Sequence, residues 1–481
     1  MGYLEDTASE LIANGTLPQP DGSFSLFEFS SVVILSITIV SFILPVLIIY
    51  PPVPATESDA LNVTHRKLGV EPSKSGLNTQ YSKSKSNVPR LHSLWVYPVK
   101  SCAGIELSSS RVLPTGLQHD RLFMFAQLRS PFPVSVDATE KEKSGHTWEM
   151  VAMRQFARMA NVDVDIWVPD EAKLRGKLNP EDRPTESYMV IRFPWKDDGW
   201  RGALQLMGAK LKWGASAQPH REILLPLEYP SKEEVEAKGY EMEPVKIWKD
   251  TVKALNMQCE VPEELQRYLG VSNKLTLFRL NPNMPREVHR NAPTKNNAGY
   301  QPIVGFQDAA SSPPTQQRSL YEADRPSQYP LNILSLSSIQ DLEEKIQKDD
   351  TIEHIDLRRF RANVIFKGAP PYDEETWKKI QMAPEDSADV TKASFDVCCR
   401  CVRCKLPNVD PNTGIRHNAE PDHTLRKFRN VDAGAPRLGC MAMQLVPLFE
   451  LQCKVEDMES WLEVGMPIQI TERGKHLYEK M

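Results

Sequence analysis

The chain has 481 residues, a formal net charge of −5 and eight cysteines. This length leaves room for two or three domains with sizeable cores. The mildly acidic balance does not favour nucleic acid, whose protein partners are usually basic. Eight cysteines in so long a chain do not make a disulfide scaffold, and half of them lie between residues 398 and 404. Metal or thiol chemistry in a reducing compartment is the simpler interpretation.

An uncharged stretch lies near the N-terminus, between Phe29 and Thr56. Its apolar part, residues 31–50, would extend about 30 Å as a helix, which matches the hydrocarbon thickness of a bilayer. We therefore predict a short tail at 1–30 and a transmembrane anchor at 31–50. A cleaved signal peptide is the weaker alternative, because no basic residue precedes the stretch and the apolar run is too long.

The flanks of this stretch differ in charge. Residues 1–30 contain no Lys or Arg, whereas Arg66, Lys67 and Lys74 follow the stretch. The positive-inside rule then places the bulk of the chain in the cytosol. Residues 51–88 are polar and lack an apolar period, so we predict a flexible linker there.

The sequence pattern after residue 88 predicts a β-rich α+β fold. Short apolar runs bounded by Gly, Pro and Asp predict strands, at 92–100, 111–113, 121–126 and 162–166. Acidic first turns and apolar residues at helical spacing predict helices, at 232–236, 262–269 and 337–346. A stretch rich in Ser, Pro and Gln at 309–328 is expected to be an exposed inserted loop.

The densest chemical signal is the group Cys398, Cys399, Cys401 and Cys404, which a turn-forming Val-Asp-Pro-Asn-Thr-Gly follows at 409–414. A thiolate at a strand end beside a tight turn is a good ligand for a soft, redox-active metal. The pair Cys401 and Cys404 could instead be half of a zinc site.

That zinc alternative lacks an obvious second ligand pair. His417 and His423 follow, but they do not repeat a zinc-finger spacing. Cys398, Cys399 and Cys440 are interpreted as packing thiols, the last of them in a strand.

Four segments, in order along the chain, together resemble one family. They are residues 94–104, 116–121, 360–364 and 403–414. The chain resembles the MOSC-domain proteins, and among them the mitochondrial amidoxime-reducing components and their bacterial counterparts. The resemblance runs from residue 91 to about residue 470, with large gaps. It implies a MOSC N-terminal-type β domain at 89–285 and a MOSC β-barrel domain at 286–481, with a molybdenum cofactor between them.

The resemblance assigns Lys100, Ser101 and Arg121 to the phosphate of the molybdopterin and its surroundings. A point charge, a hydroxyl and a guanidinium fork suit a phosphate. Arg154 is expected to line the same site. Taken alone, Lys100 would be read as a solvated loop lysine, and Arg121 with Asp120 as a surface ion pair of little energetic value.

The resemblance also places Arg361 and Asn363 on the pterin and makes Cys404 the catalytic residue and the metal ligand. The neighbouring cation of Arg403 would help to keep Cys404 a thiolate.

The chain departs from the family at two places. Pro407 and Asn408 replace threonines after Cys404, which is expected to alter the pocket beside the metal. The long insert leaves Asp308 or its neighbours as substitutes for the usual small polar residues on the cofactor.

The implied function is that of a membrane-anchored molybdenum-cofactor oxidoreductase that reduces N-hydroxylated substrates. Its electrons would come from a cytochrome b5-type donor and an NADH-dependent reductase. A cofactor carrier or sulfur-transfer module without reductase activity is the alternative, although no pyridoxal-type desulfurase domain is visible. A structural zinc or interaction protein is a third. We expect a monomer at the mitochondrial outer membrane, with the endoplasmic reticulum as the second choice.

Overall fold

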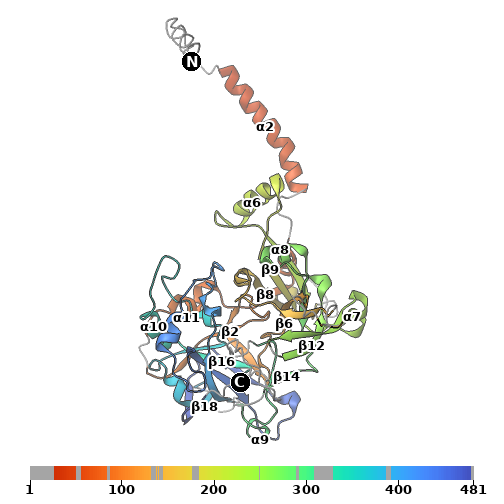
Figure 1. Ribbon diagram of the computed structural model, residues 1–481. Helices are drawn as coiled ribbons and strands as arrows, with labels where there is room; N and C mark the ends of the chain where they lie inside the picture. Colours follow the sequence, from red (N-terminus) through yellow and green to blue (C-terminus); the bar gives the residue numbers. More distant parts are fainter. Residues whose placement is uncertain are drawn as a thin grey trace. The chain divides into compact units, whose positions relative to one another are not determined.

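The computed structural model shows a β-rich chain that divides into two compact units (Figure 1). It describes residues 26–49, 56–83, 87–131, 137, 139, 145–175, 184–248, 250–288, 292–307, 329–385 and 392–477. The first unit contains α2 (Leu26–Ile49) and α6 (Gly199–Trp213), and the second contains every other element described below.

The second unit has a closed barrel and an eight-stranded sheet as its main parts. In order around the barrel, the strands are β11 (Glu241–Ile247), β12 (Asp250–Asn256), β13 (Leu275–Arg279), β6 (Phe123–Arg129) and β7 (Thr147–Met150). In order across the sheet, the strands are β22 (Ile468–Arg473), β18 (Trp377–Met382), β19 (Ala393–Val402), β20 (Cys440–Leu448), β16 (Leu331–Ser335), β17 (Val364–Lys367), β2 (Arg90–Val96) and β3 (Ile105–Leu107).

Three smaller sheets complete the β structure. They consist of β1 (His65–Lys67), β8 (Asp163–Pro169), β9 (Tyr188–Pro194) and β10 (His220–Pro226); of β21 (Ser460–Glu463), β4 (Ser109–Leu113) and β5 (Gly116–Leu117); and of β14 (Arg286–Glu287) and β15 (Ile303–Val304). Short helices lie at the periphery of this unit (Figure 1). They are α3 (Glu57–Leu61), α5 (Glu171–Leu174), α7 (Lys232–Lys238), α8 (Glu263–Leu269), α9 (Lys295–Ala298), α10 (Leu336–Glu343) and α11 (Asp422–Phe428).

The core of the large sheet is formed by strands that are buried on both faces. In β20, every residue from Cys440 to Pro447 is buried, and β19 pairs with it in antiparallel register from Ser394↔Leu448 to Val402↔Cys440. Such continuous apolar strands are typical of the interior of a sheet that is covered on both sides. The end of β19 therefore has a fixed position, and so does the start of the segment that follows it.

The predicted strands and helices correspond to β2, β4, β6 and β8 and to α7, α8 and α10. Two expectations differ from the structure. Residues 51–88 were expected to be a flexible linker, but residues 56–83 contain α3 and β1, and β1 pairs with β8 through His65↔Pro169. Leu61 and His65 are buried, and their burial explains why this mostly polar segment packs against the sheet instead of forming a flexible linker.

The second difference concerns the predicted domain boundary between residues 285 and 286. Strand β2, from the predicted N-terminal domain, pairs with β17 of the predicted C-terminal domain through Leu94↔Val364. The closed barrel lies in the N-terminal part, and the C-terminal strands form the eight-stranded sheet with β22 and β3 at its ends. The expected insertion at 309–328 and Asp308 lie outside the described residues.

The uncharged N-terminal stretch is helical, as α2. Among the described residues, no helix is long and apolar enough to cross a membrane. The predicted transmembrane anchor at 31–50 is therefore not supported by the structure.

Candidate functional site

The loops that follow β2, β5 and the 3₁₀ helix η6 (Leu357–Phe360) carry strained backbone at predicted ligand positions. Ser101, Arg121 and Arg361 have φ angles of 68°, 50° and 50°. A residue with a Cβ in this left-handed region costs roughly 1–2 kcal/mol, and such residues cluster at functional sites. Three of the eight non-glycine residues with positive φ in the described parts of the chain are therefore predicted ligand residues.

Lys100 and Ser101 are fully buried in the loop after β2. The Lys100 Nζ donates to the carbonyl oxygen of Phe306 at 3.0 Å. The Ser101 Oγ has no hydrogen-bond partner among the described residues. A solvated loop lysine is thus the wrong interpretation of Lys100, and the buried hydroxyl of Ser101 lies where a polar ligand atom would satisfy it.

Arg121 joins this loop to the segment after η6. Its Nη1 donates to the Asn363 Oδ1 at 3.2 Å, and its Nη2 donates to the Arg361 carbonyl at 3.2 Å. Its ion pair with Asp120 is buried, so the alternative of a surface pair is also wrong. The structure therefore brings Arg121 together with Arg361 and Asn363, although Arg121 is about 240 positions away from both in sequence.

Tyr97 lies beneath both arginines and was assigned no role from the sequence. The guanidinium carbons of Arg361 and Arg121 lie 4.1 Å and 5.1 Å from the centre of its ring. Burial raises the pKa of Tyr97 to about 12, and its hydroxyl has no hydrogen-bond partner within the described chain. The ring thus supports two cations by cation–π contact. Its place in the 94–104 segment put Tyr97 near the predicted site, but no local pattern indicated which side chains it would support.

Arg361 and Asn363 also hold the two chain segments in register. The Arg361 Nη1 donates to the Cys102 carbonyl at 2.6 Å, and the Asn363 Nδ2 donates to the Trp95 carbonyl at 3.0 Å. The Asn363 Oδ1 accepts from Arg121 and its Nδ2 donates to Trp95. Because both polar atoms of its side chain are engaged within the chain, Asn363 positions its neighbours.

Cys404 lies two residues beyond the end of β19 and is half-buried. Its Sγ accepts the backbone N–H of Leu406 at 3.4 Å. Hydrogen bonds to the charged form of a titratable group favour that form, so this contact suits a thiolate. The neighbouring Arg403 donates from Nη1 to the Phe360 carbonyl at 2.9 Å, which links the thiol-bearing segment to η6.

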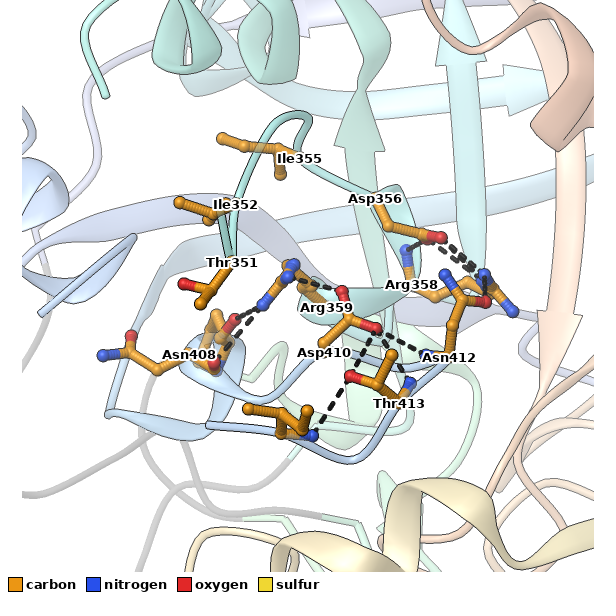
Figure 2. A network of polar contacts seen from close by, with 12 residues as sticks. Thr351, Ile352, Ile355, Asp356, Arg358, Arg359, Asn408, Asp410, Asn412 and Thr413 are labelled. Carbon is orange, nitrogen blue, oxygen red and sulfur yellow. Dashed lines mark hydrogen bonds and ion pairs between the residues drawn. The ribbon is translucent and has the colours of Figure 1, made fainter. Parts of the chain in front are cut away.

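A polar network fixes the turn that follows Cys404, and sequence reasoning missed its central residue, Arg359 (Figure 2). The Arg359 Nη1 donates to the carbonyl oxygens of Pro407 and Asn408, at 3.1 and 3.3 Å, and its Nη2 pairs with Asp410 at 2.6 Å. The Asp410 carboxylate also accepts the backbone N–H of Asn412 and of Thr413, each at 2.9 Å, as in an Asx-turn. The motif at 409–414 is therefore held from η6.

Asn408 contributes to the same turn. Its side chain is fully buried, with Nδ2 donating to the His417 carbonyl at 3.2 Å and Oδ1 accepting from the Asp422 N–H at 3.0 Å. The departure from the family at this position thus serves the loop's own hydrogen bonding.

Arg154 lies by this turn as well. Its guanidinium carbon is 3.4 Å from the centre of the Trp248 ring, and its carbonyl accepts a hydrogen bond from Arg416 at 2.5 Å. The structure thus connects Arg154 with the segment after Cys404, through Arg416.

The other thiols of the group lie inside the sheet. Cys398, Cys399, Cys401 and Cys440 are buried. Burial raises the pKa of the Cys398 and Cys399 thiols, and that of Cys440 to about 12. In the described parts of the chain, no three His, Cys, Asp or Glu side chains gather as a metal site. The second ligand pair that zinc would need beside Cys401 and Cys404 is not found there.

Comparison with known proteins defines the class of this fold and site. A family model described as the MOSC N-terminal beta barrel domain matches residues 88–190, and one described as the MOSC domain matches residues 315–469. Together these matches cover more than half of the chain. The chain therefore belongs to the MOSC-domain proteins.

The individual relatives narrow this class. The chain is 32% identical to mitochondrial amidoxime reducing component 2 of Rattus norvegicus, over 31% of this chain and 38% of the relative. It is 23% identical to the protein of the same name from Macaca fascicularis, over 78% of this chain and 81% of the relative. It is also 22% identical to a molybdenum cofactor sulfurase of Arabidopsis thaliana, over 73% of this chain and 32% of the relative. These relatives associate the chain with the molybdenum cofactor.

Proposed function

We propose that the chain is a molybdenum-cofactor oxidoreductase that reduces N-hydroxylated compounds. The observation that carries this proposal is the pairing of two features. Cations and an unsatisfied buried hydroxyl converge on strained loops at Lys100, Ser101, Arg121 and Arg361, and a half-buried thiol, Cys404, follows on a segment tied to the same loops through Arg403.

The residues present fit the cofactor. A phosphate-bearing pterin needs charge-assisted donors, which Lys100, Arg121 and Arg361 offer, and the Ser101 hydroxyl would complete the set. A soft metal needs a thiolate, which Cys404 offers beside a backbone donor. When bound there, the cofactor would supply two-electron redox chemistry at molybdenum.

The chain's own residues would have distinct tasks. Tyr97, Asp120 and Asn363 would hold the guanidinium groups of Arg121 and Arg361 in place. Arg359 and Asp410 would fix the turn so that Cys404 keeps one position. Pre-organised supports of this kind let a site hold its ligand without rearranging on binding.

Turnover with a defined electron source tests the proposal. The full chain, expressed in a host that makes molybdenum cofactor, would be mixed with cytochrome b5, its NADH-dependent reductase and an aryl amidoxime. We expect NADH oxidation to match amidine formation and to stop when cytochrome b5 is left out. Cofactor-loaded protein that reduces no N-hydroxylated substrate to the corresponding N–H compound would contradict the proposal.

A cofactor carrier or sulfur-transfer module is the second candidate, and the match to molybdenum cofactor sulfurases favours it. The same experiment separates the two functions. A carrier would contain the cofactor, lack turnover, and pass the cofactor or its sulfur to a molybdenum enzyme that lacks it.

We further propose a membrane location with the second unit in the cytosol, on the basis of sequence alone. The uncharged stretch at 31–50 and the basic residues that follow it support this proposal. Mitochondria are our first choice, by analogy with the names of the amidoxime reducing components, and the family resemblance suggests their outer membrane. Carbonate extraction of isolated mitochondria and microsomes from the native cell would test it, because a soluble or peripheral chain would be released.

A further inference from the structure

Helix α6 presents an apolar stripe to solvent. Trp200, Leu204, Met207 and Leu211 follow one another at intervals of four, three and four residues, which places them on one helix face. Trp200, Met207 and Leu211 are 71%, 54% and 82% exposed. We call the side chains of Trp200, Leu204, Met207 and Leu211 the α6 stripe. Exposed apolar stripes on folded helices mark interaction surfaces.

The opposite face of α6 fixes how the helix is oriented. Gly202 and Ala209, on that face, are buried. A Cβ at Gly202 would collide with the carbonyl of Asp197, and Gln205 is hydrogen-bonded to Asp197 through its Oε1 and Nε2, each at 2.9 Å. The stripe is thus exposed because the helix is held by its other face.

Cations flank the stripe. Arg201, Lys210 and Lys212 lie on α6, which contains no acidic residue. The Lys212 Nζ lies 4.9 Å from the Trp213 ring centre, and the guanidinium carbon of Arg201 lies 5.7 Å from that of Trp200. A tryptophan at one end of an apolar stripe, with cations on both flanks, is typical of a helix that lies in the headgroup region of an anionic membrane.

The other helix of this compact unit also exposes apolar side chains. Unit one contains α2, whose apolar side chains between Val32 and Phe42 are exposed. Cations on both flanks of an apolar stripe match an anionic lipid surface, where phosphates surround the inserted side chains on every side. A protein groove would match only if acidic side chains lined both of its rims.

We propose that α6 binds the surface of a membrane that contains anionic lipid. The α6 stripe enters the boundary between headgroups and acyl chains, and Arg201, Lys210 and Lys212 contact the phosphates. The α6 stripe shares no residue with the loops around Cys404, and the proposal depends neither on the reductase activity nor on α2 crossing a bilayer.

The test uses the full chain bound to vesicles, with an environment-sensitive fluorophore on a new cysteine at Leu211→Cys. Cys259, Cys404 and Cys453 are replaced by Ser to reduce background labelling, because these three thiols are exposed or half-exposed and the readout does not require reductase activity. The matched control has the fluorophore at Leu451→Cys, since Leu451 is also largely exposed, at 66%, and lies in the second unit. Vesicles are phosphatidylcholine alone or an equimolar mixture with phosphatidylserine.

We expect the emission at position 211 to shift to the blue and to be quenched by brominated lipid, more strongly with phosphatidylserine present. The emission at position 451 should change in neither respect. In a Lys210→Glu/Lys212→Glu variant, the phosphatidylserine-dependent part should disappear, whereas Lys246→Glu/Lys253→Glu, which alters exposed strand residues, should leave it intact. Equal behaviour at positions 211 and 451, or no quenching at 211, would overturn the proposal and leave a protein partner as the occupant of the stripe.

Discussion

The thiols within strand β19 and the thiol just beyond it differ in their exposure and in their hydrogen bonding. Within the strand, Cys398, Cys399 and Cys401 are buried, and burial raises the pKa of the first two. Two residues past the strand, Cys404 is half-buried and its sulfur accepts a backbone N–H. Four thiols that are crowded in sequence are therefore not one chemical cluster, because a strand ends between the third and the fourth.

The supports of the two regions differ as well. The thiols in β19 are held by sheet pairing and apolar packing, whereas the segment after Cys404 is held by side chains from η6, chiefly Arg359. A structural thiol needs only packing, but a ligand needs a fixed and reachable position. The predictions below test this contrast, from the largest expected effect to the smallest.

Replacing Cys404 by Ala should reduce turnover by a factor on the order of 10⁴ or more, as for loss of a residue at the reacting centre. The Cys399→Ala variant should keep turnover, because that thiol only packs in the sheet. Steady-state amidoxime reduction at equal cofactor content measures both. Full activity in Cys404→Ala, or equal loss in both variants, would contradict the contrast.

Replacing Asp410 by Ala should lower the free energy of unfolding by about 3 kcal/mol, since it leaves the buried guanidinium of Arg359 without its carboxylate and removes the Asx-turn acceptor. The matched control is Glu263→Ala, which breaks the exposed pair with Arg267 and should cost less than about 0.5 kcal/mol. Chemical denaturation of the full chain measures both, and similar costs would show that the turn is not held as described.

The 3₁₀ turn before β18 should give stability a pH dependence through Glu374, which is buried and accepts a hydrogen bond from the Ser338 hydroxyl. Burial raises the pKa of Glu374 to about 7 from 4.5. The folded state then keeps a proton that the unfolded state loses, so stability falls as pH rises from about 4.5 to 7, by up to about 3 kcal/mol. Denaturation at several pH values should show this slope, and Glu374→Gln should flatten it. An unchanged slope in the variant would contradict the assignment.

Replacing Ser101 by Gly should have opposite effects on stability and on cofactor retention. Glycine accepts the left-handed backbone and removes an unsatisfied buried hydroxyl, so the apo chain should gain about 1 kcal/mol. Cofactor content after gel filtration should fall. Thermal unfolding of the apo chain and pterin detection give the two readings, and a loss of apo stability would refute the strain argument.

Local patterns predicted the local structure well. The acidic first turns of α7 and α8 and the apolar spacing of α10 identified helices. The motif segments selected Arg121, Arg361 and Asn363, which the structure brings into contact. Helix α6 was missed because Gly199, Gly202 and Gly208 interrupt a sequence whose apolar stripe faces outward.

Long-range pairing could not be predicted. The placement of β2 beside β17, and of Arg359 beside Asp410, depends on contacts between distant segments that no local pattern encodes. For the same reason Tyr97, a support for two arginines from different loops, could be given no role from its neighbours in sequence.

Metal and pterin content of the full chain tests the central claim most directly. The chain and its Cys404→Ala variant would be expressed in a host that makes molybdenum cofactor, and metal content, phosphate-bearing pterin and the X-ray absorption of the metal would be measured. We predict near-stoichiometric molybdenum with such a pterin, and one sulfur ligand fewer at the metal in the variant. Zinc, no metal, or an unchanged sulfur shell in the variant would contradict the account of Cys404 as the ligand.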